Sequence, residues 1–301
     1  MIQRSTVVRR TLSFSFVLFS TLVSATPPAA AFGAGVMDWF RQPHSTSGHR
    51  SASQHRERDE AISLYSPAQR QASFTACASQ FPGRQPLKLA TVPSRMKPLA
   101  LCSNHFAVLY SQTSKTPLVV VQRLNAAQLR DAKGEERTNE FFADPRLPKS
   151  ARAELADYKG SNLDRGHQAP AGDAPNPSAM AQSFALSNMV PQDATHNRKI
   201  WSKVESDVRK YARRAPGDVF VFTGPLFDEG FRTVGRNRIW VPTRMFKLVY
   251  DEQSGRAWAF VSDNRSDVSV GRPMSYGSFV RTTGLELLGD VPIAGTVGGA
   301  H

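Results

Sequence analysis

The stretch from Asn197 to about Arg214 places the tightest constraint on how this chain folds. Its apolar residues recur at i, i+3, i+7, i+10 and i+14, which forms one continuous stripe on an α-helix. The stripe consists of Trp201, Val204, Val208, Tyr211 and Ala215. Pro216 and Gly217 would end the helix. Basic residues fill its flanks, so we expect one face to pack on a core and the remainder to present positive charge.

Five further segments, rich in β-branched and aromatic residues, are expected to form strands. They are residues 106–110, 117–122, 218–223, 245–250 and 257–261. Residues 62–290 contain these strands and the helix, and about 230 residues suit one domain with a single α/β-type core.

The first 31 residues are expected to be a secretory signal peptide. Arg4, Arg9 and Arg10 form a positively charged start, and the apolar segment 12–23 is too short to span a bilayer. Cleavage would leave a secreted or periplasmic protein without membrane attachment, and an uncleaved membrane anchor is the alternative. Residues 32–61 are expected to form a flexible basic tether, and residues 291–301 a frayed tail.

The formal net charge is +13, which favours polyanions as partners. Charge alone leaves a basic export protein and a nucleic-acid-binding protein equally open. The two cysteines, Cys77 and Cys102, predict one structural disulfide in an exported chain. Neither a Cys-x-x-Cys pair nor a His/Cys cluster indicates a zinc site.

The sequence Asp164-Arg165-Gly166-His167 gathers several groups that could carry out chemistry. A histidine near its usual pKa of about 6.5 is a suitable base for a water molecule. Arg165 offers a guanidinium fork that matches phosphate, and Asp164 can pair with a cation. Gly166 would let the backbone approach a ligand closely. A Ser-His-Asp hydrolase is not indicated, because Gly-x-Ser-x-Gly does not occur.

Asn197 breaks the apolar pattern at the start of the basic helix, and helical periodicity turns it toward the protein. Two roles are open. As an N-cap it would bind the first N–H groups of the helix, although Asp193 and Thr195 compete for that position. Alternatively, its amide oxygen would bind a hard cation such as Mg²⁺.

Together these motifs resemble the DNA/RNA non-specific endonucleases, the Asp-Arg-Gly-His branch of the ββα-metal (His-metal finger) nucleases. The tetrapeptide is followed by Asn197, Trp201 and Glu205 at the spacing of that family. The similarity extends to residues 186–192 and 223–227 and, more weakly, to 281–285. It implies an α+β fold with a central, mainly antiparallel β-sheet flanked by helices.

The resemblance also implies how the base and the metal are arranged. His167 would be the general base that activates water. Asn197 would be the single direct protein ligand of Mg²⁺, with Mn²⁺ as the alternative ion. Glu205 would position the waters around the ion, because a rise of about 12 Å along the helix separates it from Asn197.

Four more residues receive roles from the resemblance. Arg165 and Arg209 would bind the phosphate and stabilise its charge, Asn188 would help to hold the site near the phosphate, and Arg137 is a weaker assignment as a substrate-binding residue.

The implied function is a secreted, Mg²⁺-dependent endonuclease that hydrolyses DNA and RNA and leaves 5′-phosphate and 3′-hydroxyl ends. A protein inhibitor is a further expected partner. Two alternatives stay open: a non-catalytic polyanion-binding protein on the same scaffold, and an enzyme that acts on a small phosphodiester. The excess of positive charge argues against the second alternative.

Overall fold

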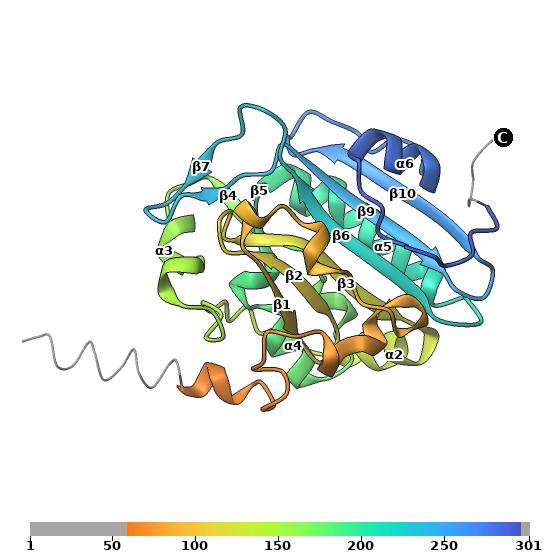
Figure 1. Cartoon of the computed structure of the whole chain (residues 1–301), viewed down its shortest axis with the longest axis horizontal. Coiled ribbons are helices and arrows are strands. Elements are labelled where there is room, and N and C mark those ends of the chain that lie inside the picture. Colours follow the sequence, from red (N-terminus) through yellow and green to blue (C-terminus); the bar gives the residue numbers. More distant parts are fainter. Residues whose placement is uncertain (1–58, 296–301) are drawn as a thin grey trace, which may run out of the picture. The chain divides into compact units, whose positions relative to one another are not determined.

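The computed structural model describes residues 59–295. The predicted signal peptide, the predicted tether up to residue 58 and residues 296–301 lie outside the described part. Within it, one large sheet carries helices on both faces (Figure 1). The predicted α+β class with a central, mainly antiparallel sheet is confirmed.

The large sheet has seven strands in the order β1-β2-β3-β6-β9-β10-β11, and each neighbouring pair is antiparallel. The five predicted strands are β2, β3, β6, β9 and β10. The edge strands β1 and β11 are not among the predictions, because β1 has no β-branched residue and β11 has only two residues. The bounds are β1 Pro98–Cys102, β2 Ala107–Ser111, β3 Thr116–Leu124, β6 Val219–Leu226, β9 Arg244–Asp251, β10 Arg256–Asp263 and β11 Met274–Ser275.

Two small antiparallel pairs stand outside this sheet. The first joins β4, Leu163–His167, to β5, Met189–Asp193. The second joins β7, Thr233–Val234, to β8, Ile239–Trp240. None of the four strands is among the sequence predictions, because β4 is a polar segment and the others are short or interrupted.

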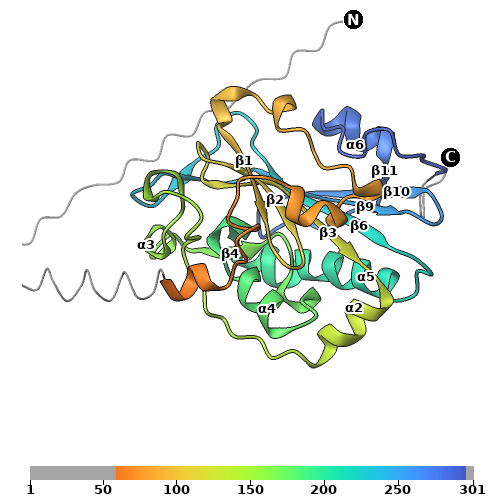
Figure 2. The same ribbon diagram turned by 60° about the horizontal axis from the view of Figure 1, so that its bottom comes forward.

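The helical elements are short except for one. Residues 59–63 are α-helical, and the labelled α-helices are α2 Ala126–Asp131, α3 Leu155–Tyr158, α4 Pro177–Ser183, α5 Ser202–Ala212 and α6 Tyr276–Thr283. A π-helix, η9 His196–Trp201, leads directly into α5. The 3-10 turns are η1 Thr75–Gln80, η2 Pro82–Arg84, η3 Leu89–Thr91, η4 Ser94–Met96, η5 Ala132–Gly134, η6 Lys149–Ala151, η7 Ala171–Asp173 and η8 Leu186–Asn188. Figure 2 shows α6 on one side of the large sheet and α2, α4 and α5 on the other.

Alternate side chains of the central strands enter two different cores. On β9, Phe246 and Leu248 pack in the core that contains Phe279 of α6. Met245 and Val249, on the opposite face, pack against the apolar stripe of η9 and α5. The helix predicted from the stripe is therefore confirmed in position and in the face that it buries.

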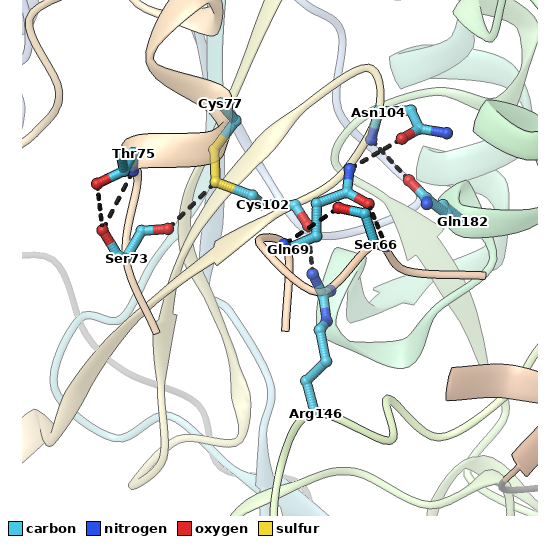
Figure 3. The surroundings of a disulfide bond; sticks show 9 residues. All are labelled: Ser66, Gln69, Ser73, Thr75, Cys77, Cys102, Asn104, Arg146 and Gln182. Carbon is cyan, nitrogen blue, oxygen red and sulfur yellow. Dashed lines mark hydrogen bonds between the residues drawn. A yellow bond between two sulfur atoms is a disulfide. The ribbon is translucent and has the colours of Figure 1, made fainter. Parts of the chain in front are cut away.

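The predicted disulfide between Cys77 and Cys102 is present, with a Cα–Cα distance of 5.4 Å. It joins η1 to the edge strand β1 (Figure 3). In the same region Gln69 Nε2 donates to Asn104 Oδ1 at 2.8 Å, and the Asn104 backbone N–H donates to Gln182 Oε1 at 2.6 Å. These bonds connect the segment before η1 to α4.

Residues 291–295 differ from the expected frayed tail. The Ala294 N–H donates to the Gly255 carbonyl at 2.7 Å, and the Ala257 N–H donates to the Gly295 carbonyl at 2.9 Å. Backbone hydrogen bonds to the β9–β10 hairpin hold this segment, and its small-residue composition gives no indication of them. Among the described helices, none has the length and hydropathy needed to cross a membrane.

Candidate active site

The Asp-Arg-Gly-His sequence forms β4, and its pairing with β5 sets the direction of each side chain. Gly166 lies opposite Val190, and His167 lies opposite Met189. A Cβ at position 166 would collide with the Gln192 side chain. The expectation that Gly166 admits a ligand is therefore corrected: the glycine makes room for Gln192, whose Nε2 lies 2.8 Å from His196 Nδ1.

The imidazole of His167 packs against two phenylalanine rings. The ring centroids of Phe141 and Phe184 are 5.7 and 5.0 Å from that of the imidazole, and both contacts are edge-to-face. His167 Nε2 is buried and has no hydrogen-bond partner among the described residues. Burial, with Arg137 and Arg165 adding to it, lowers the pKa of His167 to about 3. The imidazole is therefore neutral at pH 7, with an unpartnered ring nitrogen.

An arginine lies over each of these two phenylalanine rings. The Arg165 guanidinium carbon lies 4.0 Å from the centroid of the Phe141 ring, and that of Arg137 lies 5.0 Å from the centroid of the Phe184 ring. These are cation–π distances. Sequence reasoning placed both arginines in the site but did not identify Phe184, which nothing in the local pattern distinguishes from a core residue.

Asn188 is fully buried, and its side chain is occupied by backbone groups. Oδ1 accepts from the Ala169 N–H at 2.9 Å, and Nδ2 donates to the carbonyls of Ala169 and Ser183 at 3.0 and 2.9 Å. It thus fixes the chain two residues after His167. With both ends of the amide engaged, Asn188 holds the loop and does not offer a free group to a phosphate.

The segment around Asn197 is a π-helix rather than the first turn of an α-helix. The N-cap role for Asn197 is wrong, because Asp193 Oδ1 accepts the His196 N–H at 2.8 Å and Asn197 lies inside the turn. The inward direction of Asn197 was predicted from regular α-helical periodicity, and the π-turn changes that periodicity at this position. Such turns inside helices are frequent at functional sites.

The Asn197 amide is oriented by β4. Its Nδ2 donates to Asp164 Oδ2 at 2.9 Å, and the described residues donate no hydrogen bond to its Oδ1. Arg198 binds both oxygens of the same carboxylate, at 2.8 and 2.6 Å. Burial acts to raise the pKa of Asp164, but these hydrogen bonds outweigh it and hold the pKa below its usual value. Asp164 therefore pairs with a cation, as predicted, and also orients Asn197.

These residues fit a hydrated hard cation. In the described part of the chain, no three His, Cys, Asp or Glu side chains are grouped to hold a metal ion. The oriented Asn197 Oδ1 is an oxygen donor of the type that Mg²⁺ accepts, and Mg²⁺ commonly keeps several waters when it binds proteins.

Glu205 and Arg209 follow on α5, one turn apart. Glu205 is partly buried, and burial raises its pKa to about 7 against the opposing effect of Lys247. Arg209 Nε forms an ion pair with Asp173 of η7. Burial acts to lower the pKa of Arg209, but Asp173 outweighs this and raises it. Arg209 lies at the site, already paired with a carboxylate.

Lys247 is the charged residue of this region that sequence reasoning did not identify. It is buried on β9, and its Nζ donates to Thr223 Oγ1 at 2.6 Å. A lysine in the middle of the apolar segment 245–250 is the sequence feature that could have marked it, because unpaired lysines are rarely buried.

The sequence model of the DNA/RNA non-specific endonuclease family matches residues 85–284. The chain belongs to this family. The match covers η3 to α6 and therefore includes every site residue named above. The family predicted from the sequence motifs is confirmed.

Several curated relatives support the assignment. Mitochondrial nuclease 1 of Schizosaccharomyces pombe is 32% identical over 63% of this chain and 66% of its own length. Nuclease C1 of Cunninghamella echinulata is 36% identical over 52% and 66%. Human mitochondrial endonuclease G is 34% identical over 50% and 54%. The chain spans between about half and two thirds of these relatives.

A solved structure titled as the EndoG/EndoGI complex and the mechanism of EndoG inhibition shares the fold. Its TM-score is 0.60 at 24% sequence identity, over 66% of this chain and 91% of that chain. This similarity supports the ββα-metal architecture independently of the sequence motifs.

The prediction of a secreted or periplasmic protein is wrong by these comparisons. The fission-yeast, zebrafish and human relatives are named as mitochondrial nucleases. Composition misled the prediction, since residues 1–31 contain three arginines, five serines and no acidic residue. An organelle import segment has this composition too.

Proposed function

We propose that the chain is an endonuclease that hydrolyses phosphodiester bonds of DNA and RNA with Mg²⁺ and leaves 5′-phosphate and 3′-hydroxyl ends. One observation carries the proposal: a neutral His167 with an unpartnered Nε2 contacts two phenylalanine rings, each of which has a guanidinium group over it. Family membership and the excess of positive charge support the same function.

His167 acts as the general base in this proposal. Its unprotonated nitrogen accepts a proton from a water molecule, whose oxygen attacks phosphorus while the bond to the 3′ oxygen breaks, and the departing oxygen takes a proton from solvent to become the 3′-hydroxyl. A phosphate bound beside the imidazole would oppose the effect of Arg137 and Arg165. This raises the pKa of His167 toward the range in which a base is effective.

Arg165 and Arg137 bind the non-bridging oxygens of the phosphate in our proposal. Stacking on Phe141 and Phe184 fixes the plane of each guanidinium before the substrate arrives, which reduces the entropy lost on binding. Contacts to phosphate carry no information about the base, so DNA and RNA both bind.

Asn197 would hold the Mg²⁺ ion through Oδ1, and Glu205 would hold waters of the ion. When bound, the ion supplies positive charge that stabilises the charge added at phosphorus. Asn188 fixes the loop that follows His167, and Asp173 fixes the direction of Arg209 toward the same region.

The proposal is tested by incubating the protein with plasmid DNA and with RNA, in Mg²⁺ and in chelator, beside His167→Ala. We expect both polymers to be degraded in Mg²⁺ only, and the variant to lose almost all activity. End labelling of the products should find 5′-phosphates. Intact polymers in Mg²⁺, or a variant as fast as the parent, would refute the function.

A protein inhibitor is also part of the proposal, because the fold relative was solved in a complex whose title names inhibition. An inhibitor of this chain would have to place acidic groups against Arg137 and Arg165. Loss of plasmid cleavage on adding a candidate protein, and its return in high salt, would test the idea.

A further inference from the structure

Lys247 is buried in the centre of the large sheet, with 2% of its surface exposed. Its neighbours Met245 and Val249 both enter the core beneath α5, so alternation along the strand turns Lys247 to the same face. Consistent with this, Lys247 Nζ lies 5.8 Å from the centroid of the Trp201 ring, where η9 meets α5. The ammonium group therefore faces the helix that carries the proposed metal-binding residues.

An ammonium in an apolar layer is costly unless other groups compensate for it. Its hydrogen-bond partner is Thr223 Oγ1, which lies directly opposite on β6. None of the ion pairs formed by the described residues includes Lys247. A neutral hydroxyl alone does not balance the charge of the buried ammonium group, so another group nearby must compensate for it.

That group is Glu205. It lies on α5 four residues after Trp201, and it forms no hydrogen bond or ion pair with the described residues. Of all charges near it, Lys247 acts most strongly on the Glu205 carboxyl group, and the glutamate acts in turn on the lysine. Because Lys247 Nζ lies 5.8 Å from the Trp201 ring and Glu205 follows Trp201 by one helical turn, the buried base and the partly buried acid lie on the two sides of the layer between sheet and helix.

The other charged groups around Glu205 are already occupied. They come from three elements: Asp173 of η7, Arg209 of α5 and Arg137 of the loop after η5. Asp173 and Arg209 pair with each other, and Arg137 binds Asn139 and stacks on Phe184. Of the three cations near Glu205, Lys247 is the one whose side chain donates only to a neutral hydroxyl, and its aromatic neighbour, Trp201, lies one helical turn before Glu205.

We propose that Lys247, held by Thr223, is a positioning residue that holds the Glu205 carboxylate in place for phosphodiester cleavage. The inference rests on the proposed function. Lys247 itself does not contact the nucleic acid, because it lies beneath the helix. It therefore affects turnover and leaves substrate binding unchanged.

The test compares wild type, Lys247→Met and Lys247→Arg, with kcat and KM for a DNA duplex measured from pH 5.5 to 9 in saturating Mg²⁺. In Lys247→Met the acid limb of kcat should move up by roughly one pH unit or more, with kcat at pH 6.5 reduced about tenfold. KM should stay within about twofold, because only rate is affected. Lys247→Arg, which keeps the charge, should restore most of the acid limb.

Repeating the Lys247→Met substitution in a Glu205→Gln protein tests whether Lys247 acts through Glu205. Once the carboxylate is removed, Lys247→Met should cause no further change in kcat or in the pH profile. The inference is overturned if the acid limb of kcat does not move in Lys247→Met. It is also overturned if Lys247→Met lowers kcat equally in the wild-type and Glu205→Gln proteins. If Lys247→Met does not fold by circular dichroism, Thr223→Val takes its place, with the same shift expected and an unmoved limb equally decisive.

Failure of this inference is distinguishable from failure of the proposed function. If His167→Ala cleaves as fast as wild type, the nuclease mechanism is wrong whatever Lys247 does. If His167→Ala is inactive while Lys247→Met matches wild type, only the role of Lys247 is refuted.

Discussion

Asn197 Nδ2 donates a hydrogen bond of 2.9 Å to Asp164 Oδ2, and this bond joins the strand of the proposed base to the helix of the proposed metal ligand. Because the nitrogen end of the amide is used, Oδ1 points away from Asp164. Outer partners of this kind orient metal ligands and affect affinity strongly. In the proposed function, the Asp164-Arg165-Gly166-His167 segment would contribute to metal binding by orienting Asn197, without supplying a ligand.

Asp164→Ala should therefore weaken metal binding. We expect the Mg²⁺ concentration for half-maximal cleavage to rise about 10- to 100-fold, with most of kcat recovered at saturating Mg²⁺. Arg198→Ala is the matched control, because it removes the other partner of Asp164, an arginine whose side chain is 70% exposed. Equal effects of the two substitutions would contradict the orienting role.

His167 should make the folded protein acid-sensitive. Its folded pKa, about 3, lies below the unfolded value of about 6.5, so the unfolded state binds more protons between these values. Stability is therefore lost as pH falls below about 6.5, at up to about 1.4 kcal/mol per pH unit.

His167→Leu removes this titration. From pH 6.5 to 4.5, wild type should lose about 2 kcal/mol more unfolding free energy than the variant, measured by urea denaturation. Other groups titrate in both proteins, so only the difference is diagnostic. A difference that stays constant with pH would mean that the imidazole is not held neutral.

Sequence patterns predicted the parts of this fold that repeat regularly. The five predicted strands are segments rich in β-branched and aromatic residues, and the apolar stripe of α5 follows the helical period of 3.6. The π-turn at Asn197 leaves no such pattern, since one extra residue in a turn changes the phase without changing composition. The sequence did not predict the strand β4 either, because Asp164 and Arg165 are polar and give it no apolar pattern. Their side chains are held by other side chains in the folded protein.

In the candidate site, too, the sequence predicted some residues and the folded structure revealed others. The motifs and the family resemblance predicted roles for His167, Asn197 and Glu205, but contacts between distant segments decide how each side chain is held. Phe184 became recognisable only when the fold brought it against His167, and the fold also shows that Lys247, a lysine inside an apolar segment, lies against Trp201. Spacing along a chain carries no information about such partners.

Asn188→Ala should destabilise the protein by about 2–4 kcal/mol, because it leaves three buried backbone groups at Ala169 and Ser183 without partners. Thermal unfolding would measure the loss. Asn125→Ala, which removes the N-cap of α2 far along the chain, should cost about 1 kcal/mol.

The Asn188→Ala and Asn125→Ala variants also separate an effect on stability from an effect on the position of His167. At a temperature where both variants remain folded, kcat of Asn188→Ala should be at least about tenfold lower than that of Asn125→Ala, since small displacements of a catalytic group are costly. Equal kcat values would show that Asn188 serves stability alone.

Arg165→Lys should reduce kcat/KM even though the charge is kept. A lysine offers neither the planar fork for phosphate nor the flat face that stacks on Phe141 at 4.0 Å. We expect a loss of roughly tenfold or more, corresponding to about 1–2 kcal/mol. Arg213→Lys, at an exposed position at the end of α5, should change kcat/KM by less than about twofold. If both substitutions had the same small effect, the guanidinium of Arg165 would be acting only as a diffuse charge, and the stacked geometry would have no part in holding the phosphate.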